Sequence, residues 1–415
     1  MGNATRNGSA TSSESLWLNA PRVFAGVAER NVTVFHRIRF AAPDPVAVIE
    51  WPSGKRTLII RDIEVVRARA AARANEVYCP ADFTPAGGLS GDRELAVAES
   101  LAECMRRVNT SRVVGDRSLP LVYVHALREA GVEVTCDPYL GVADRRAKDE
   151  QELVWLAEAQ TTTEAAMRMA ATMVLSASAE AESTVRGDAE AGDCDHAEGR
   201  RQLMLDGELL TSERVRVAID RWLLERGYDN PQCIVAGGPM GADPHERGSG
   251  PLCTGEPIII DIFPRNRTTH FWGDCTRTIV HGRPSDTVIA AHAAVCQAKV
   301  AAIATVRAGV SASAVHDAAT AVIVKSGYVF GSAAGDGPVP AMVHGTGHGV
   351  GLDIHEAPLL DAGGPALVVG DVITIEPGLY HRAMGGIRVE DMVVVTETGC
   401  RNLNRLPESL ALVEG

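Results

Sequence analysis

His344, His348 and His355 lie close together in the stretch HGTGHGVGLDIHE, residues 344–356. Imidazole side chains at this density could bind a metal ion or transfer protons. His344 and His348 have the i, i+4 spacing of a helical zinc motif. However, glycine occupies every odd position from 345 to 351, and each glycine would cost a helix about 1 kcal/mol relative to alanine. We therefore exclude a helix for this stretch.

The alternating glycines instead favour an extended strand, in which successive side chains point to opposite faces. The even-numbered residues from His344 to Leu352 then share one face, and the glycine face lets another backbone or a ligand come close. His355 has the opposite parity, so a bend near Asp353 is needed to bring it to the same site. The alternative is a glycine-rich loop with unrelated histidines.

Four acidic residues occupy matching positions in an internal repeat. The segment EPIIIDIFPRNRTTHFWGDCTRTIV (256–280) has an apolar run, an acid, a polar loop and a second acid, and DVITIEPGLYHRAMGGIRVEDMVVV (371–395) has the same order. The acids are Asp261 and Asp274, 13 positions apart, and Glu376 and Glu390, 14 positions apart. Each segment is predicted to form a long hairpin with one acid from each strand.

Acids at the ends of apolar runs are costly to bury unless a cation compensates them. One possibility is neutralisation by arginines of the same segments, namely Arg265, Arg267, Arg277 and Arg388. That possibility leaves the histidines unexplained. The other is that four carboxylates and His348 converge on two divalent metal ions of the manganese, cobalt, iron or zinc kind. Two such ions, about 3.5–4 Å apart, can share carboxylates and activate a water molecule.

The elements that position these residues belong to a long, acidic chain. Its 415 residues are too many for one ordinary core, so two domains are expected. The formal net charge of −13 argues against nucleic acid or an anionic membrane as a partner. We find no apolar run near the roughly 18 residues of a membrane span. The polar start lacks the apolar core of a signal peptide.

Nine cysteines, an odd number without a C-x-x-C pair, are interpreted as reduced thiols of a cytoplasmic protein. Residues 1 to about 15 have a disordered composition. We place a domain boundary near 147: residues 1–147 mix strand-like and helical segments, and a long helix follows, to about Ser183. The segment AGDCDHAEG (191–199) could be an acidic metal loop, but a solvated loop is the simpler interpretation.

These motifs resemble those of the pita-bread metallohydrolases, the family of prolidase, aminopeptidase P, methionine aminopeptidase and creatinase. The matching pieces are IIIDIF, GDCTRT, HGTGHGVGLDIHE, TIEPGLY and GGIRVED, within about 150–410. The resemblance implies an α+β fold. Residues 148–415 would form a pita-bread catalytic domain, a curved antiparallel sheet flanked by helices with a pseudo-twofold repeat. Residues 1–147 would form a creatinase-like α/β domain with a capping or dimerisation role.

The resemblance also implies a role for each matching residue. Asp261 would chelate one metal ion, Asp274 and Glu390 would bridge two, and His348 and Glu376 would complete the second. Glu376 would also act as general base and acid. Substrate contact and oxyanion stabilisation would fall to two histidines, His344 and His355. The remaining residues are His245, for proton transfer or substrate binding, and Arg388, which would orient the bridging Glu390.

Two features depart from the family pattern. Twelve residues separate Asp261 from Asp274, whereas the family commonly has ten, and an even insertion preserves the facing of both acids. The loop that carries Pro264 and Trp272 must then differ, and with it the rim of the pocket. The stretch before His245 also lacks an asparagine that the family often has there.

The N-terminal domain favours the prolidase and aminopeptidase P arrangement over that of methionine aminopeptidase. The resemblance therefore implies a homodimeric Xaa-Pro dipeptidase or aminopeptidase with two divalent ions, manganese first and cobalt, zinc or iron as alternatives. Its partners would be short peptides with proline at the second position, with no nucleic acid and no membrane. Two alternatives stay open: a related hydrolase of a non-peptide C–N or ester bond, and a non-catalytic binding protein of the same fold.

Overall fold

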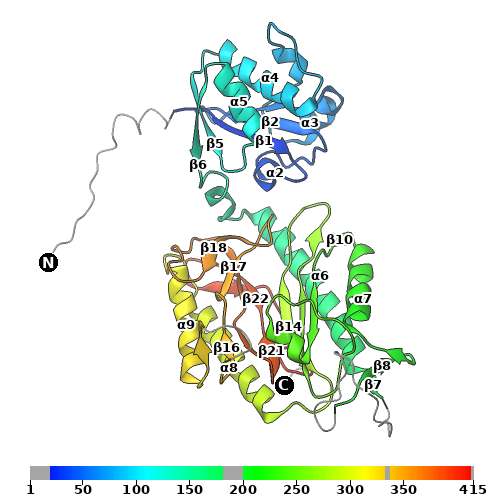
Figure 1. Ribbon diagram of the computed structural model, residues 1–415. Coiled ribbons are helices and arrows are strands. Elements are labelled where there is room, and N and C mark those ends of the chain that lie inside the picture. The colour runs from blue at the N-terminus through cyan, green and yellow to red at the C-terminus, as the bar shows by residue number, and fades with distance from the viewer. Residues whose placement is uncertain (1–18, 181–199, 332–336, 413–415) are drawn as a thin grey trace, which may run out of the picture. The chain divides into compact units, whose positions relative to one another are not determined.

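The computed structural model describes residues 19–180, 200–331 and 337–412. The chain folds as two compact units, Met1–Arg145 and Arg146–Gly415 (Figure 1). The segment expected to be disordered, 1 to about 15, and the candidate acidic loop at 191–199 both lie outside the described residues.

The smaller unit is built on a six-stranded sheet with the order β4-β3-β2-β1-β5-β6. Its strands are β1 (Arg22–Val27), β2 (Pro45–Glu50), β3 (Arg56–Ile59), β4 (Glu76–Tyr78), β5 (Arg112–Asp116) and β6 (Glu133–Asp137). The central pairs β1–β2 and β2–β3 are antiparallel, whereas β4, β5 and β6 join in parallel.

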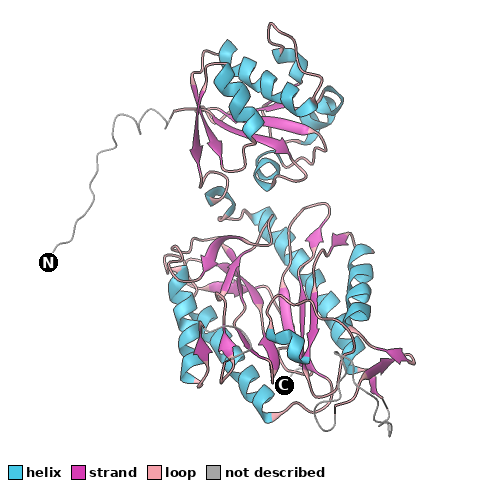
Figure 2. Ribbon diagram, in the orientation of Figure 1, coloured by secondary structure: helices cyan, strands magenta, loops and turns pink. Residues whose placement is uncertain are grey.

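Helices cover both faces of this sheet (Figure 2). They are α2 (Val32–Ile38), α3 (Val65–Ala71), α4 (Arg93–Arg107) and α5 (Leu121–Glu129). Alternate residues of β1 point to opposite faces: Val23 packs in one core with Leu101 of α4 and Leu127 of α5, while Phe24 packs in the other with Val34 and Ile38 of α2. The unit is therefore a three-layer α/β domain.

The larger unit has a central set of strands with one pair of helices on each side (Figure 1). The helices are α6 (Glu150–Leu175) and α7 (Ser212–Leu224) on one side, and α8 (Asp286–Thr305) and α9 (Ala312–Lys325) on the other. Helix α6 begins with a capping box, in which Asp149 accepts from the Glu152 amide and Glu152 accepts from the Asp149 amide. It ends at Leu175, so the prediction that this helix continues to about Ser183 is wrong.

The strands of this unit form three main sheets. The first is β11 (Ile234–Gly237), β12 (Pro257–Ile262) and β14 (Cys275–Val280). The second has the order β15 (Val329–Phe330), β16 (Ala341–Met342), β20 (Gly378–His381) and β21 (Gly385–Arg388). The third has the order β18 (Glu356–Leu360), β17 (Gly347–Gly349), β19 (Val372–Ile375), β22 (Asp391–Val395) and β23 (Cys400–Asn402). Short strands complete the unit: β7 (Ser178–Ala179), β8 (Leu203–Leu205), β9 (Glu208–Leu209), β10 (Tyr228–Asp229) and β13 (Arg265–Asn266).

The internal repeat is visible as two antiparallel strand pairs. Strand β12 pairs with β14, placing Asp261 opposite Thr276, and β19 pairs with β22, placing Ile375 opposite Asp391. The second pair differs from the prediction of a simple hairpin. Between β19 and β22 the chain enters another sheet, where β20 and β21 form their own hairpin. The repeat therefore sets the strand order but not the path of the connecting segment.

Helix α8 is long and apolar enough, by length and composition, to cross a membrane. The sequence analysis did not single it out, because polar residues interrupt its apolar residues. In the structure its residues Val288, Ala291, Val295 and Ala298 pack in the core cluster that contains Ile373 of β19. The core helix of a soluble protein has the same composition, so α8 is weak evidence for a membrane span.

The cysteines are not all free thiols. Seven of them, Cys79, Cys104, Cys136, Cys233, Cys275, Cys296 and Cys400, are free in the described part of the chain. Cys253 is disulfide-bonded, so the expectation of nine reduced thiols is wrong at this position.

A buried cluster of charges lies beneath strand β22. The Asp391 carboxylate accepts from Arg277 at 2.9 Å, from Lys299 of α8 at 2.5 Å and from Asn402 at 2.9 Å. Lys299 also donates to Glu408 at 2.6 Å. The two cations keep the pKa of Asp391 below its ordinary value against the opposing effect of burial. A charge group of this kind is satisfied only as long as every member stays in place.

We expect Lys299→Met to destabilise the larger unit by about 3 kcal/mol, because the change leaves a buried carboxylate short of one cation. Urea unfolding measures the effect. Lys325→Met, at the exposed end of α9, is the matched control and should change the free energy of unfolding by less than about 0.5 kcal/mol. Equal effects of the two substitutions would show that the cluster does not stabilise the fold.

Candidate metal centre

The four acids of the repeat reach one place from four different strand positions. Asp261 lies within β12, Asp274 directly precedes β14, Glu376 directly follows β19 and Glu390 directly precedes β22. His348, in the middle of β17, faces them. The structure therefore brings together all five residues that the sequence analysis proposed as metal ligands.

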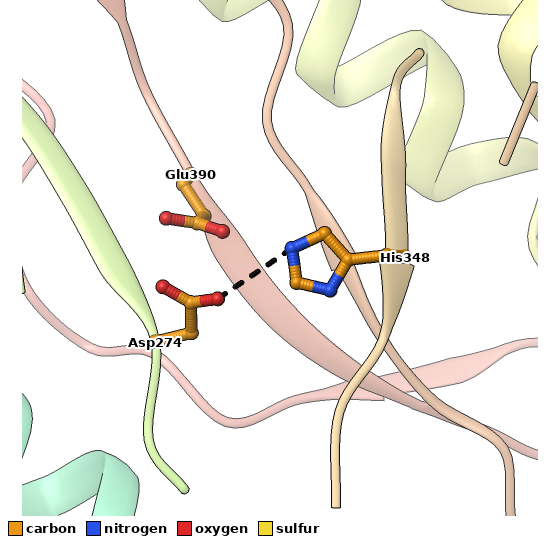
Figure 3. A group of neighbouring side chains, drawn as sticks. All are labelled: Asp274, His348 and Glu390. Carbon is orange, nitrogen blue, oxygen red and sulfur yellow. Dashed lines mark ion pairs between the residues drawn. The ribbon is translucent and has the colours of Figure 1, made fainter. Parts of the chain in front are cut away.

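Distances within the group are short. The Nε2 atom of His348 lies 3.4 Å from Oε1 of Glu376 and 3.7 Å from Oδ2 of Asp274. Ligand atoms of Asp274, His348 and Glu390 all lie within 4.8 Å of one another, and the three side chains point toward a common centre (Figure 3). All three residues are buried.

The glycines around His348 are required by close backbone approaches. A Cβ atom at Gly347 would lie 2.0 Å from the carbonyl oxygen of Thr374, and one at Gly349 would lie 2.4 Å from that of Ala357. Glycine at these positions lets β17 fit between β18 and β19. The Thr374 hydroxyl also accepts a hydrogen bond from the His348 amide at 3.0 Å, which fixes the histidine opposite Glu376.

The prediction of an extended strand is correct, but the observed strand is shorter than the predicted one. Only Gly347–Gly349 forms a strand, with a register shift between His348 and Gly349. The chain then turns through 351–355 and returns as β18, antiparallel to β17. The bend expected near Asp353 is therefore present, and it brings the His355 ring to 4.2 Å from the His348 ring, centre to centre.

The acids raise one another's pKa values. Burial raises the pKa of Asp274 well above its ordinary value, and the nearby charges of Glu390, Asp261 and Glu376 add to the rise. Burial and the charges of Glu376 and Asp261 raise the pKa of Glu390 in the same direction. Burial raises the pKa of Glu376 to about 7. Four ionised carboxylates at this site therefore require more positive charge than the surrounding side chains supply.

The proposed neutralisation by four arginines fails on geometry. Arg388 donates to Asp261 at 2.7 Å and lies 3.9 Å from Glu376. Arg277 pairs with Asp391 instead, and Arg267 pairs with Asp229 of β10. Within the described chain, Arg388 is the one member of the proposed set that forms an ion pair with a site acid. A single guanidinium does not balance four carboxylates.

The site therefore fits divalent metal ions. The second carboxylate oxygen of Asp261, Oδ1, is buried and has no hydrogen-bond partner among the described residues, as expected for an oxygen that faces a metal. Burial and the neighbouring His355 lower the pKa of His348 to about 3, which keeps the imidazole neutral and able to bind a metal. Carboxylate oxygens with one imidazole nitrogen suit manganese, cobalt, iron or zinc.

Two residues that the sequence analysis missed hold the candidate metal ligands in place. Gln160 of α6 is fully buried, donates to the Asp274 carbonyl at 2.7 Å and accepts from the Asp274 amide at 2.8 Å. Thr276 donates its hydroxyl hydrogen to Glu390 at 2.8 Å. Such contacts behind the ligands orient them. A glutamine more than a hundred positions from its partner gives no local signal in the sequence.

Arg388 contacts a different acid from the one predicted. It pairs with Asp261 and approaches Glu376, whereas Thr276 holds Glu390. Arg388 reaches Glu390 through Thr276: its Nε donates to the Thr276 hydroxyl at 3.2 Å, and that hydroxyl donates to Glu390. That Arg388 orients Glu390 stays a prediction. Side chains alternate in direction along β21, but the acid that Arg388 contacts depends on how β21 crosses β12. The sequence pattern does not show that crossing.

His344 uses both of its ring nitrogens within the protein. Nδ1 lies 2.7 Å from the Gly345 carbonyl and must donate, while Nε2 lies 2.7 Å from the Tyr380 hydroxyl. The Tyr380 oxygen also accepts from Arg388 at 3.0 Å, so its own hydrogen points to Nε2. Burial lowers the pKa of His344 to about 4. In this arrangement His344 has no N–H left for a substrate oxyanion, and its predicted contact with substrate stays a prediction.

His355 and His245 are the exposed histidines of the site. His245 follows Pro244, whose carbonyl accepts from Arg388 at 3.2 Å. The charge of His245 acts on the pKa of both His344 and His355, which places it within electrostatic reach of the group. These two imidazoles are therefore placed to meet a ligand.

Comparison with known proteins agrees with this geometry. The model of metallopeptidase family M24 matches residues 154–397, more than half of the chain. The chain belongs to metallopeptidase family M24. The resemblance inferred from the sequence motifs is thus confirmed. Family membership implies divalent metal ions, in agreement with the group around His348.

Individual relatives match about half of the chain. The probable dipeptidase PepE of Mycobacterium tuberculosis is 37% identical over 206 residues, which are 49% of this chain and 52% of that protein. The Xaa-Pro dipeptidase of Pyrococcus furiosus is 35% identical over 200 residues, which are 47% of this chain and 54% of that protein. The chain therefore spans about half the length of these curated relatives.

The fold is shared over nearly the whole chain. The solved structure of an Xaa-Pro dipeptidase from Bacillus anthracis superimposes with a TM-score of 0.74 at 21% sequence identity, covering 94% of each chain. The predicted fold class, α+β with a pita-bread catalytic domain and an N-terminal α/β domain, is confirmed.

We expect His348→Ala and His355→Ala to separate metal binding from substrate contact. His348→Ala removes the one nitrogen ligand and should lose most of the bound metal, whereas His355→Ala should keep it and lose about 10²–10³ in kcat. Elemental analysis of the purified variants measures the metal content. Metal loss in His355→Ala with retention in His348→Ala would reverse the assignment.

Proposed function

We propose that this chain hydrolyses Xaa-Pro peptide bonds with two divalent metal ions, of which manganese is the first candidate and cobalt, zinc or iron the alternatives. The observation that supports this proposal most strongly is the convergence of three buried carboxylates, the half-buried Glu376 and His348 beside two exposed histidines. The relatives named as dipeptidases and Xaa-Pro dipeptidases support the substrate class. A purely binding role would not need this set of ligands.

Five residues would hold the metals. Asp261 would bind the first ion, Asp274 and Glu390 would bridge, and His348 with Glu376 would bind the second. When bound, the metals would supply a strongly acidified water and polarise the substrate carbonyl. Gln160, Thr276 and Arg388 would hold the carboxylates in the required orientation through the hydrogen bonds described above.

Glu376 would move the proton in this reaction. Its carboxylate lies 3.4 Å from the His348 imidazole and 3.9 Å from the Arg388 guanidinium. A carboxylate at this position could accept a proton from the attacking water and return it to the leaving nitrogen. His355, exposed beside His348, would donate a hydrogen bond to the carbonyl oxygen as negative charge develops there.

The chemistry suits a bond that precedes proline. An Xaa-Pro bond is a tertiary amide without an N–H group, so a peptidase that binds that hydrogen cannot hold it. The groups assigned here act on the carbonyl and on the leaving nitrogen, and they need no amide hydrogen. Preference for proline over other residues must then come from the shape of the pocket around the ring.

Three further features of the function are also proposals. We infer that the first unit limits the length of the substrate, that the protein is a homodimer, and that it is cytoplasmic. The disulfide at Cys253 is a feature more typical of oxidising compartments, so fractionation of cells is the direct test of location. Light scattering of the purified chain tests the dimer.

Metal removal should abolish activity. Asp261→Asn or Glu390→Gln removes one of four charges that balance the two ions, and we expect each variant to lose activity by at least 10³-fold, on the order expected for loss of metal catalysis. Chelation should inactivate the wild type, and manganese or cobalt should restore it. Full activity in a sample shown to be metal-free would refute the proposed metal centre.

We expect proline at the second position to raise the rate. Ala-Pro or Xaa-Pro-Yaa should be cleaved at least about 10-fold faster in kcat/KM than Ala-Ala or Met-Ala counterparts, a difference of about 1.4 kcal/mol. Assays with the manganese-loaded enzyme measure it, and comparing Ala-Pro with longer peptides separates dipeptidase from aminopeptidase. Equal or faster cleavage of the peptides without proline would reject the Xaa-Pro assignment and leave the metallohydrolase standing.

A further inference from the structure

The loop from Gly351 to Glu356, which carries His355, is held by parts of the chain outside the histidine motif. It begins two residues after β17 ends and runs to the first residue of β18. Its first half contacts the lengthened loop between Asp261 and Asp274, and its last residue pairs with the start of α6. The position of His355 therefore depends on contacts that the motif itself does not contain.

Trp272 makes two hydrogen bonds to the first half of this loop. Its indole Nε1 donates to the Leu352 carbonyl at 3.0 Å, and its backbone amide donates to the Gly351 carbonyl at 3.1 Å. One residue thus fixes two successive peptide groups. Trp272 lies two positions before the metal ligand Asp274, so the same segment places both the ligand and the histidine loop.

The segment before Trp272 is braced internally, so that the tryptophan is held firmly. The side chain of Asn266 accepts from the amides of Thr268 and Thr269 at 2.8 and 2.9 Å. Phe271, the residue directly before Trp272, is 1% exposed, and its ring lies 5.6 Å from the Trp155 ring of α6, centre to centre. This lengthened loop, twelve residues rather than ten between the two aspartates, is the part of the chain that departs from the family pattern.

The other end of the histidine loop is locked by a buried ion pair. Lys148 donates to Glu356 at 2.6 Å, and both side chains are 2% exposed. Glu356 directly follows His355. A Cβ atom at Gly351 would lie 2.4 Å from Oε1 of Glu356, so the two ends of the loop are also packed against each other.

The His355 imidazole depends on this loop for its orientation. It is exposed, and its recorded ring contact is the edge-to-face packing on His348 at 4.2 Å. Among the residues that the structure describes, no hydrogen bond fixes the imidazole of His355. Its placement toward a substrate therefore follows from the loop backbone.

We propose that Trp272 is a positioning residue that acts through His355, by holding the Gly351–Glu356 loop with its indole N–H. This inference rests on the proposed hydrolysis, because His355 is the group assigned to the substrate carbonyl. Loss of the indole hydrogen bond releases the Leu352 carbonyl and lets His355 move relative to that oxygen. Misplacement of a catalytic group by a fraction of an ångström lowers kcat more than it changes substrate binding.

Trp272→Phe tests the role of the indole hydrogen, because it keeps an aromatic ring and the backbone amide. We expect kcat to fall roughly 10-fold, with KM within about twofold and the metal content unchanged. Hydrogen exchange of the amides in 351–356 should become faster. Trp222→Phe is the matched control: Trp222 lies on α7, stacks on Arg226 at 3.8 Å, and should leave kcat and loop exchange unchanged.

A double-mutant cycle separates positioning from general damage. If Trp272 acts through His355, Trp272→Phe should cause no further loss of kcat in a His355→Ala background. Losses that multiply would overturn the proposal, as would an unchanged kcat and unchanged loop exchange in Trp272→Phe.

If the proposed hydrolysis is wrong, the same experiments give a different set of results. In that case the metal-loaded wild type would cleave no Xaa-Pro peptide, while the exchange of the 351–356 amides would still decide whether Trp272 holds the loop. Faster exchange in Trp272→Phe alone would then support the structural half of the inference, and unchanged exchange would reject it.

Discussion

The need to hold four carboxylates together in a buried place dominates the larger unit of this protein. Burial raises the pKa of Asp274 and of Glu390, and the charges of Asp261 and Glu376 raise both further. Such a group is stable only if cations are bound among the carboxylates or if protons neutralise them. The single guanidinium of Arg388 pairs closely with Asp261 and more distantly with Glu376. Divalent metal ions, which membership of the family implies, would balance the rest of the charge, and the local features of the site fit that requirement.

The protein holds the carboxylates by using polar groups that remain satisfied around them. Gln160 clamps the main chain of Asp274, and Thr276 orients Glu390. One residue beyond Glu390, Asp391 points the opposite way and is neutralised by Arg277 and Lys299. Adjacent acids of one strand thus have separate cations: protein side chains for one and the metal site for the other. This separation prevents Arg277 from competing with metal ions for the Glu390 carboxylate.

The sequence predicted the parts of the site that depend on local pattern. An acid at the end of an apolar run is visible in one segment, and its repetition in a second segment identified four ligands. The spacing of the glycines predicted an extended backbone at His348, although the strand is only three residues long because β17 shifts register there. Contacts between distant segments had no such signal. Three contacts depend on how α6, β20 and β21 cross the strands that carry the acids. They are the hydrogen bonds of Gln160 to Asp274, the ion pair of Arg388 with Asp261, and the hydrogen bond between His344 and Tyr380.

The two halves of the repeat complete each other rather than act as independent copies. Arg388 from the second half pairs with Asp261 of the first, and Thr276 from the first half holds Glu390 of the second. The backbone is joined in the same way: the Thr278 hydroxyl donates to the Arg388 carbonyl and accepts from the Arg388 amide, each at 3.0 Å. Neither half alone would have its acids oriented or its charges balanced. The metal centre is therefore a property of the junction between the halves, and a single half would carry two acids without a site.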